Sequence, residues 1–159
     1  MSRLKSYAKE IAVALLLLFI ISNSISFYRA NYASQILIKS MPSIFFKNEN
    51  AKPVLYYFYA SWCPVCNLEL SNIEQISKSY RVIGVMSSSG DTNAMRAYLK
   101  SHNASVVSLN DNNGAVAKSF GVKAFPTTII YDSNGELFYS DIGYTSTLGL
   151  YIRLWLASI

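Results

Sequence analysis

The stretch WCPVC, residues 62–66, decides the fold because it holds both cysteines of the chain and joins two segments of different character. Before it, residues 54–59 (VLYYFY) are β-branched and aromatic with no polar alternation, which predicts a strand buried on both faces. After it, apolar residues recur at helical spacing over residues 68–80, which predicts a helix that begins near Cys63 or Pro64. We therefore expect both cysteines where a strand leads into the N-terminus of a helix.

That position bears on the chemistry of the two cysteines. The first N–H groups of a helix have no partner within the helix and, with the helix dipole, favour an anion, so Cys63 should ionise more readily than a free thiol with a pKa of about 8.5. Pro64 suits the first turn because it lacks an N–H and has a fixed φ. Cys66 follows one turn later, close enough to attack a mixed disulfide on Cys63 and release the partner. The spacing predicts Cys63 as the nucleophile and Cys66 as the resolving cysteine.

The composition predicts one packed domain preceded by a separate N-terminal segment. The chain has 159 residues, 52% of them hydrophobic, and a formal net charge of +5, which excludes a disordered chain. Four of the 14 basic and one of the nine acidic residues lie in residues 1–29, so the remainder has 10 basic and 8 acidic residues, a net charge of +2. No basic stripe is interleaved with aromatic residues, so we expect no nucleic-acid partner.

The N-terminal segment has the pattern of an export signal. Residues 1–10 are basic and residues 11–21 are uninterruptedly apolar. The small residues Ser22 and Ser24 are compatible with cleavage of a signal peptide, whereas residues 11–27 are compatible with a single membrane span. We favour the uncleaved span, which predicts a cytoplasmic N-terminus and an exported C-terminal part.

The predicted organisation is a signal anchor over residues 1–29, a connector over residues 30–52 and one domain over residues 53–159. An exported pair of cysteines also has a structural interpretation, namely a stabilising disulfide. The C-x-x-C spacing closes almost no loop, however, so such a disulfide would stabilise the fold little. A redox pair is the better interpretation.

The rest of the domain alternates strands and helices, which predicts an α/β fold with parallel crossovers. Turn signals separate the segments, including Asp111–Gly114 ahead of a short helix through Phe120 and the hairpin dipeptide Asn134–Gly135. The predicted strands after the cysteines are residues 81–86, 105–109, 125–131 and 137–139, and the predicted longer helices are residues 92–102 and 148–159.

The aromatic strand, the WCPVC motif, Phe125-Pro126-Thr127 and Asn134-Gly135, in this order, resemble the thioredoxin superfamily over about residues 53–159. The tail from Gly143 to Trp155 resembles the ScsD-type protein disulfide oxidoreductases, a membrane-anchored, exported branch named for suppression of copper sensitivity. The resemblance implies a thioredoxin-like α/β fold with a central mixed β-sheet flanked by helices, after an N-terminal transmembrane or signal helix.

The same resemblance implies a substrate groove beside the cysteines. Pro126 would follow a cis peptide bond and face the cysteines, the backbone of Phe125 would pair with an incoming segment, and Trp62 would shield the disulfide. The expected substrate-binding residues are thus Trp62, Pro64, Val65, Phe125 and Pro126. The alternatives are a proline that only opens an edge strand and a half-buried aromatic residue at position 62.

Three positions depart from the thioredoxin pattern or leave it open. Tyr57 stands where many thioredoxins have a buried acid. Glu69 matches an acid that is frequent in the exported branch, but a charged residue on a helix is more simply interpreted as solvated, and we interpret it so. Ser71 replaces a proline that kinks the helix in many relatives, so we expect a straighter helix.

We therefore predict a thiol–disulfide oxidoreductase that needs no cofactor, in the bacterial inner membrane with its catalytic domain facing the periplasm or cell exterior. Its partners would be proteins with thiols or disulfides and, by resemblance, a membrane electron donor. Pro64 and Val65 include no histidine to stabilise a Cys63 thiolate, so a reductase or isomerase is favoured over a strong oxidant.

Two other functions use the same sequence features. Two thiolates can bind Cu(I) as a metal-binding module or metallochaperone. A tetrahedral zinc site would need four ligands, and His102, the one histidine, is expected at the surface. A non-catalytic scaffold would not require the intact cysteine pair.

Overall fold

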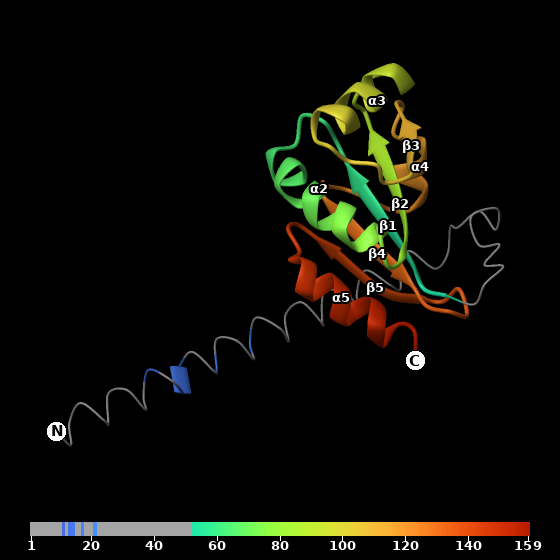
Figure 1. The fold of residues 1–159 in the computed structure, drawn as a ribbon. Coiled ribbons are helices and arrows are strands. Elements are labelled where there is room, and N and C mark those ends of the chain that lie inside the picture. The colour runs from blue at the N-terminus through green and yellow to red at the C-terminus, as the bar shows by residue number, and fades with distance from the viewer. Residues whose placement is uncertain (1–10, 12, 15–16, 18–20, 22–51) are drawn as a thin grey trace.

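The computed structural model describes residues 52–159 together with Ile11, Val13, Ala14, Leu17 and Ile21 (Figure 1). A five-stranded sheet with the order β3-β2-β1-β4-β5 forms its centre. The strands are β1 (Val54–Tyr59), β2 (Arg81–Ser87), β3 (Ser108–Asp111), β4 (Thr127–Tyr131) and β5 (Leu137–Ile142), and the helices are α2 (Pro64–Ser77), α3 (Thr92–Ser101), α4 (Ala115–Ser119) and α5 (Thr147–Leu156).

The sheet is mixed, as the resemblance implied. β1 pairs in parallel with β2, which pairs in parallel with β3, whereas β4 is antiparallel to both β1 and β5. All six residues of β1 are buried because helices cover both faces of the sheet. The larger core cluster lies under α2, α3 and α5 and includes Tyr57, Tyr59, Ile73, Met95 and Leu154. The smaller lies under α4 and includes Tyr56, Phe58 and Phe120.

β3 begins at Ser108, later than the predicted strand at residues 105–109. The carboxylate of Glu74 on α2 accepts hydrogen bonds from the backbone N–H of Ser105 at 2.7 Å and of Val106 at 2.9 Å. The Ser105 hydroxyl donates to the same carboxylate at 2.7 Å. Because these two amides are bound to a side chain, they are not available to a neighbouring strand, and pairing with β2 starts only at Ser108.

Asp111 ends β3 and also holds the start of α4. Its buried carboxylate accepts hydrogen bonds from the Ser87 hydroxyl at 2.9 Å and from the N–H groups of Val116 at 3.0 Å and Ala117 at 2.9 Å. The predicted turn and short helix are therefore present. The N-cap residue of α4 is Gly114, which has no side chain, and Asp111, three residues earlier, accepts the free N–H groups in its place.

The C-terminal hairpin is longer than predicted, and the C-terminal helix is shorter. β5 extends to Ile142, three residues beyond the predicted end. The predicted hairpin is closed by Asp132, whose carboxylate accepts the N–H groups of Asn134 and Glu136 at 2.9 and 2.8 Å. α5 begins after the N-cap Ser146 and packs beside α2 (Figure 1).

The predicted anchor over residues 1–29 and the connector over residues 30–52 lie almost wholly outside the described residues. The five residues described between Ile11 and Ile21 are helical and exposed. Within the part of the chain that the structure describes, no helix has the length and apolar character needed to cross a bilayer.

Candidate active site

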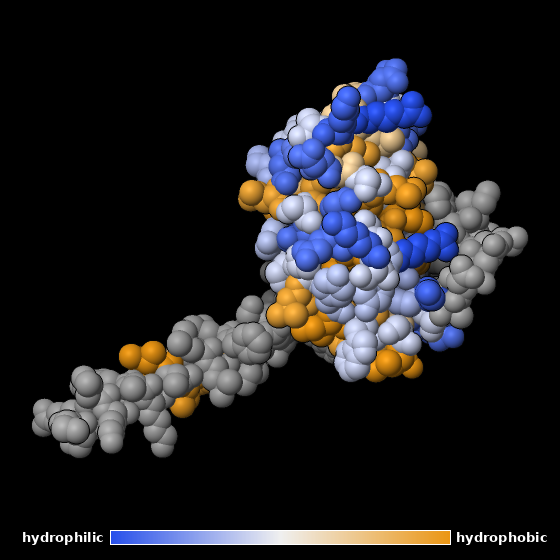
Figure 2. Space-filling view, viewed as in Figure 1, coloured by the Kyte–Doolittle hydropathy of each residue, from blue (hydrophilic) through white to orange (hydrophobic). Residues whose placement is uncertain are grey.

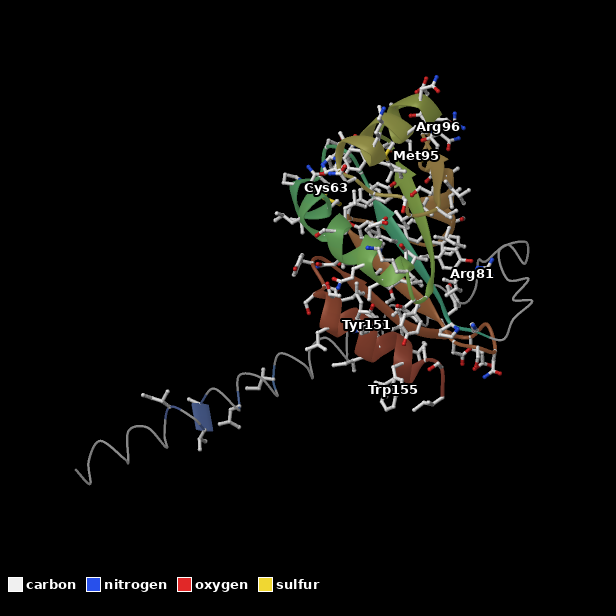
Figure 3. The ribbon with its side chains drawn as sticks, in the orientation of Figure 1. Cys63, Arg81, Met95, Arg96, Tyr151 and Trp155 are labelled. Atoms are coloured by element: carbon white, nitrogen blue, oxygen red, sulfur yellow. A yellow bond between two sulfur atoms is a disulfide. The ribbon has the colours of Figure 1, made fainter. Side chains whose placement is uncertain are left out.

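Cys63 and Cys66 form a disulfide at the beginning of α2. Cys63 is the N-cap residue with an extended backbone, and its Sγ accepts the N–H of Cys66 at 3.2 Å. The helix starts at Pro64, as predicted. The two sulfurs differ in access, because Cys63 is 5% exposed whereas Cys66 is fully buried. Figure 3 shows Cys63 at the edge of the domain where α2 begins.

The predicted groove residues lie around Cys63. The peptide bond between Phe125 and Pro126 is cis, as the resemblance implied. The carbonyl oxygen of Phe125 is 3.6 Å from Cys63 Sγ. The Trp62 and Phe125 rings make an edge-to-face contact with centroids 5.9 Å apart. The structure therefore brings Phe125 and Pro126 to Trp62 and the disulfide, although Phe125 is 62 positions after Cys63.

Exposed side chains surround the disulfide. Pro64 and Val65 are exposed between the two cysteines, and Trp62 is 63% exposed, more than a half-buried aromatic residue would be. Pro126, in contrast, is buried. Figure 2 shows hydrophobic surface at the edge of the molecule where α2 begins. A partner that approaches Cys63 would meet an apolar rim.

Glu69 is buried, and its interpretation as a solvated charge was wrong. It is fully buried on the inner side of α2, where its Oε1 accepts the backbone N–H of Thr145 at 2.8 Å. The pKa of Glu69 is raised from 4.5 to about 7. Burial is the largest cause, and the charge of Asp141 adds to it, whereas the Thr145 N–H and the neighbouring Tyr57 hydroxyl partly offset the rise. The sequence contained the signal, because Glu69 is three positions after Cys66 and four before Ile73, which is the spacing of one helix face.

Tyr57 is a neighbour of both Glu69 and Cys66. Its hydroxyl donates to the carbonyl oxygen of Cys66 at 3.2 Å. Burial, reinforced by the charge of Glu69, raises the pKa of Tyr57 above its ordinary value, so the hydroxyl remains a donor at any physiological pH. The position that holds an acid in many thioredoxins thus holds a hydrogen-bond donor here, and the buried carboxyl group beside it is that of Glu69 on α2.

The sequence of residues 43–148 matches the Redoxin family. The chain belongs to this family and, with it, to the thioredoxin superfamily. The match covers the strand before the cysteines, both cysteines and the segment with the cis proline.

Relatives of this redoxin are bacterial thiol–disulfide proteins. It is 31% identical over 107 residues to a thioredoxin-like protein of Haemophilus influenzae, which covers 67% of this chain and 64% of that protein. It is 35% identical over 94 residues to the thiol:disulfide interchange protein DsbE of Escherichia coli K12, covering 58% of this chain and 50% of that protein. The chain thus spans about half to two-thirds of these relatives. The solved structure of MTB DsbF, in mixed oxidised and reduced forms, has 26% identity and a TM-score of 0.62 over 68% of this chain and 82% of that one.

The redoxin site includes a serine loop, residues 88–89, that follows β2. Ser88 has a positive φ of 50°, and its carbonyl oxygen accepts the indole N–H of Trp62 at 3.0 Å. Ser89 Oγ accepts the N–H of Ser61 at 2.9 Å. Both bonds join the segment after β2 to the segment just ahead of Cys63. The loop therefore fixes the orientation of Trp62.

The described part of the redoxin contains no group of three or more His, Cys, Asp or Glu side chains placed to bind a metal. His102 is at the surface, as predicted, with its ring 4.3 Å from that of Tyr98 and its Nδ1 2.9 Å from the Tyr98 carbonyl oxygen. For the copper alternative, the described residues thus offer the two cysteine sulfurs and no larger ligand set.

Proposed function

We propose that the protein is an exported thiol–disulfide oxidoreductase that exchanges disulfides with partner proteins through Cys63 and Cys66. The observation that carries this proposal is the asymmetry of the pair. Cys63 is the N-cap residue of α2, keeps 5% exposure and lies beside the Phe125 carbonyl, whereas Cys66 is fully buried one turn along the helix. A buried sulfur cannot meet a partner but can reach its neighbour.

The proposed reaction is two successive exchanges. In the reduced protein, the Cys63 thiolate attacks one sulfur of a partner disulfide, which forms a mixed disulfide and releases a partner thiolate. The Cys66 thiolate then attacks Cys63 Sγ, which releases the second partner thiolate and leaves the Cys63–Cys66 disulfide. Two electrons pass to the partner, and the reverse sequence oxidises a partner dithiol. Trp62, Pro64, Val65, Phe125 and Pro126 form the rim against which the partner segment binds.

Glu69 is the proposed acceptor of the Cys66 proton. Cys66 must lose a proton before it attacks, and Glu69, one turn along the same helix face, has a pKa of about 7. A carboxyl with that pKa is partly ionised at neutral pH and can both take up and return a proton. The Tyr57 hydroxyl, bound to the Cys66 carbonyl, keeps the helix turn that holds both groups in place.

The direction of electron flow is proposed to be that of a reductase or isomerase. Pro64 and Val65 include no histidine that would stabilise the Cys63 thiolate further. Export is supported by the basic and then apolar residues 1–21, which also support an inner-membrane anchor and a catalytic domain in the periplasm or cell exterior. A membrane thiol–disulfide protein is the proposed electron donor, because a reductase must be reduced again after each cycle.

The test is to trap the mixed disulfide. Cys66→Ala keeps the nucleophile but removes the resolving thiol, so partner proteins should accumulate on Cys63 and separate on non-reducing gels. Cys63→Ala is the matched control, since it keeps one buried thiol and should trap nothing. Absence of any trapped species in the Cys66→Ala variant, or equal trapping by both variants, would reject the proposed function.

A further inference from the structure

One row of residues crosses the sheet beneath α2. Tyr57 of β1 pairs with Thr128 of β4, and Thr128 pairs with Asp141 of β5. Directly paired residues point to the same face of a sheet. Tyr57 belongs to the core under α2 and α5, so all three side chains point to the face that carries Glu69.

Asp141 is held in this row by its neighbours. The Tyr139 hydroxyl donates to Asp141 Oδ2 at 2.7 Å, and the backbone N–H of Ile142 donates to Oδ1 at 2.9 Å. Arg153 of α5 lies over the Tyr139 ring, with its guanidinium carbon 4.4 Å from the ring centroid. These two hydrogen bonds hold the Asp141 carboxylate in place on β5.

The same short segment reaches Glu69. Thr145, four residues after Asp141, donates its backbone N–H to Glu69 Oε1. The other oxygen of Glu69, Oε2, is buried and accepts no hydrogen bond from the described residues, and the same is true of Thr128 Oγ1. A segment of four residues therefore connects Asp141 with the backbone donor of Glu69, on a face of the sheet where buried charges are poorly screened.

We propose that Asp141 is a second acid of the redox site, a positioning residue that acts through Glu69. Its negative charge opposes a negative charge on Glu69 and so adds to burial, which is the main reason that Glu69 holds its proton. Glu69 can then return a proton to the Cys66 thiolate when the disulfide opens and accept it when Cys66 attacks. This inference rests on the proposed thiol–disulfide exchange.

The groups that act on Glu69 come from β1, from β5 and from the turn before α5, and each has further charged or titratable neighbours. Tyr57 of β1 and the Thr145 N–H stabilise its charged form, and Asp141 of β5 opposes it. Burial is the largest cause of the raised pKa of Glu69, and Asp141 adds to it. Tyr98 of α3 raises the pKa of Tyr57, and its hydroxyl donates a hydrogen bond to Asn67 of α2 at 2.6 Å. The positive charge of Arg153 on α5 lowers the pKa of Tyr139, which is itself bound to Asp141.

The experiment is a titration of the Glu69 carboxyl by carbon NMR in the oxidised protein and in Asp141→Asn. Loss of the charge should shift the Glu69 titration to lower pH, because it removes the like charge that opposes ionisation. Asp132→Asn is the matched control, because it removes the same charge at the hairpin end of the sheet and should leave the Glu69 pKa unchanged. Asp141→Glu restores the charge and should return the pKa toward that of the natural protein.

A second readout is the pH profile of the resolving step, measured as release of a model mixed disulfide from Cys63. Its acid limb should move to lower pH in Asp141→Asn by the same amount as the Glu69 pKa. If Asp141→Asn does not fold, Asp141→Ser removes the same charge with a smaller side chain. An unchanged Glu69 pKa in Asp141→Asn, or an equal change in Asp132→Asn, would overturn the inference. An Asp141→Asn variant that is less stable but keeps the natural Glu69 pKa would overturn it as well.

The two proposals fail in different ways. If Cys66→Ala traps no partner while the Glu69 pKa moves as expected, the electrostatic coupling stands and the proposed exchange fails. If trapping succeeds while the Glu69 pKa does not move, the exchange stands and the role of Asp141 fails.

Discussion

Thr145 donates its backbone N–H to Glu69 Oε1 at 2.8 Å, across 76 positions of the sequence. This hydrogen bond ties the turn before α5 to the helix that carries the disulfide. One backbone donor stabilises the carboxylate, but the side chain is fully buried, and burial has the larger effect on its pKa. Glu69 therefore changes charge near neutral pH, and this affects stability as well as chemistry.

The free energy of unfolding of the oxidised protein should fall between about pH 4.5 and pH 7 because of Glu69. The folded-state pKa is above the unfolded value, so the folded state binds the proton more tightly, and this advantage is lost as the pH rises through the folded pKa. With pKa values of 4.5 and about 7, at about 1.4 kcal/mol per pH unit, the loss is about 3 kcal/mol. In Glu69→Gln, denaturant unfolding should give a flatter curve over this range.

The exposed Glu136→Gln is the control for this measurement, since it changes the same charge on the hairpin. Its curve should follow that of the natural protein. A Glu69→Gln curve with the same slope between pH 5 and 8 would contradict the assignment of the buried acid.

Glu74 should affect stability with the opposite sign. Burial alone would raise its pKa, but hydrogen bonds from Ser105 and Val106 outweigh burial and hold the pKa below its usual value. Its contribution is therefore present above the unfolded pKa and is lost as the pH falls through the folded one. Glu74→Gln should cost about 1–3 kcal/mol at neutral pH, and the difference from the natural protein should shrink below about pH 4. A difference that stays constant down to pH 3 would show that packing, not charge, is responsible.

The elements that the sequence predicted well are those with local causes. β1 has the predicted bounds because six consecutive apolar or aromatic residues suit a strand that is covered on both faces. α2 starts at Pro64, as predicted, because proline suits the first helical position and the apolar residues that follow recur at helical spacing. The placement of Phe125 and Pro126 beside Cys63 followed from the resemblance, since no local pattern relates residues that far apart.

The features that the sequence did not predict depend on distant partners. β3 starts late because its first amides bind Glu74, 31 positions earlier. Glu69 is buried because Thr145 supplies a donor, and Trp62 is oriented by a carbonyl 26 positions later, at Ser88. The general rule that charged side chains are solvated, which led to the interpretation of Glu69 as a solvated charge, fails at this position. A buried acid next to a redox pair is an exception with a chemical reason.

Trp62 should report the redox state of the pair. The chain has two tryptophans, and Figure 3 shows Trp155 on α5, far from Cys63. In Trp155→Phe, Trp62 is the sole indole, and its position next to Cys63 lets the disulfide quench it. Its emission should therefore rise when the disulfide is reduced. Trp62→Phe keeps an aromatic ring near Phe125 but leaves only Trp155, whose emission should not respond. A redox response carried by Trp155 would contradict the arrangement of the rim.

The two thiols of the reduced protein should differ strongly in reactivity. Cys63 is at the surface end of α2, where the helix N-terminus favours the thiolate, whereas Cys66 is fully buried. Iodoacetamide should alkylate Cys63 at least about tenfold faster than Cys66, as measured by mass spectrometry of the peptides. As the pH is lowered, the rate at Cys63 should stay high well below pH 8.5, which is about the pKa of a free thiol. Cys63→Ala provides the rate at Cys66 alone. Similar rates at the two positions, or a Cys63 profile with an ordinary thiol pKa, would remove the basis for assigning Cys63 as the nucleophile.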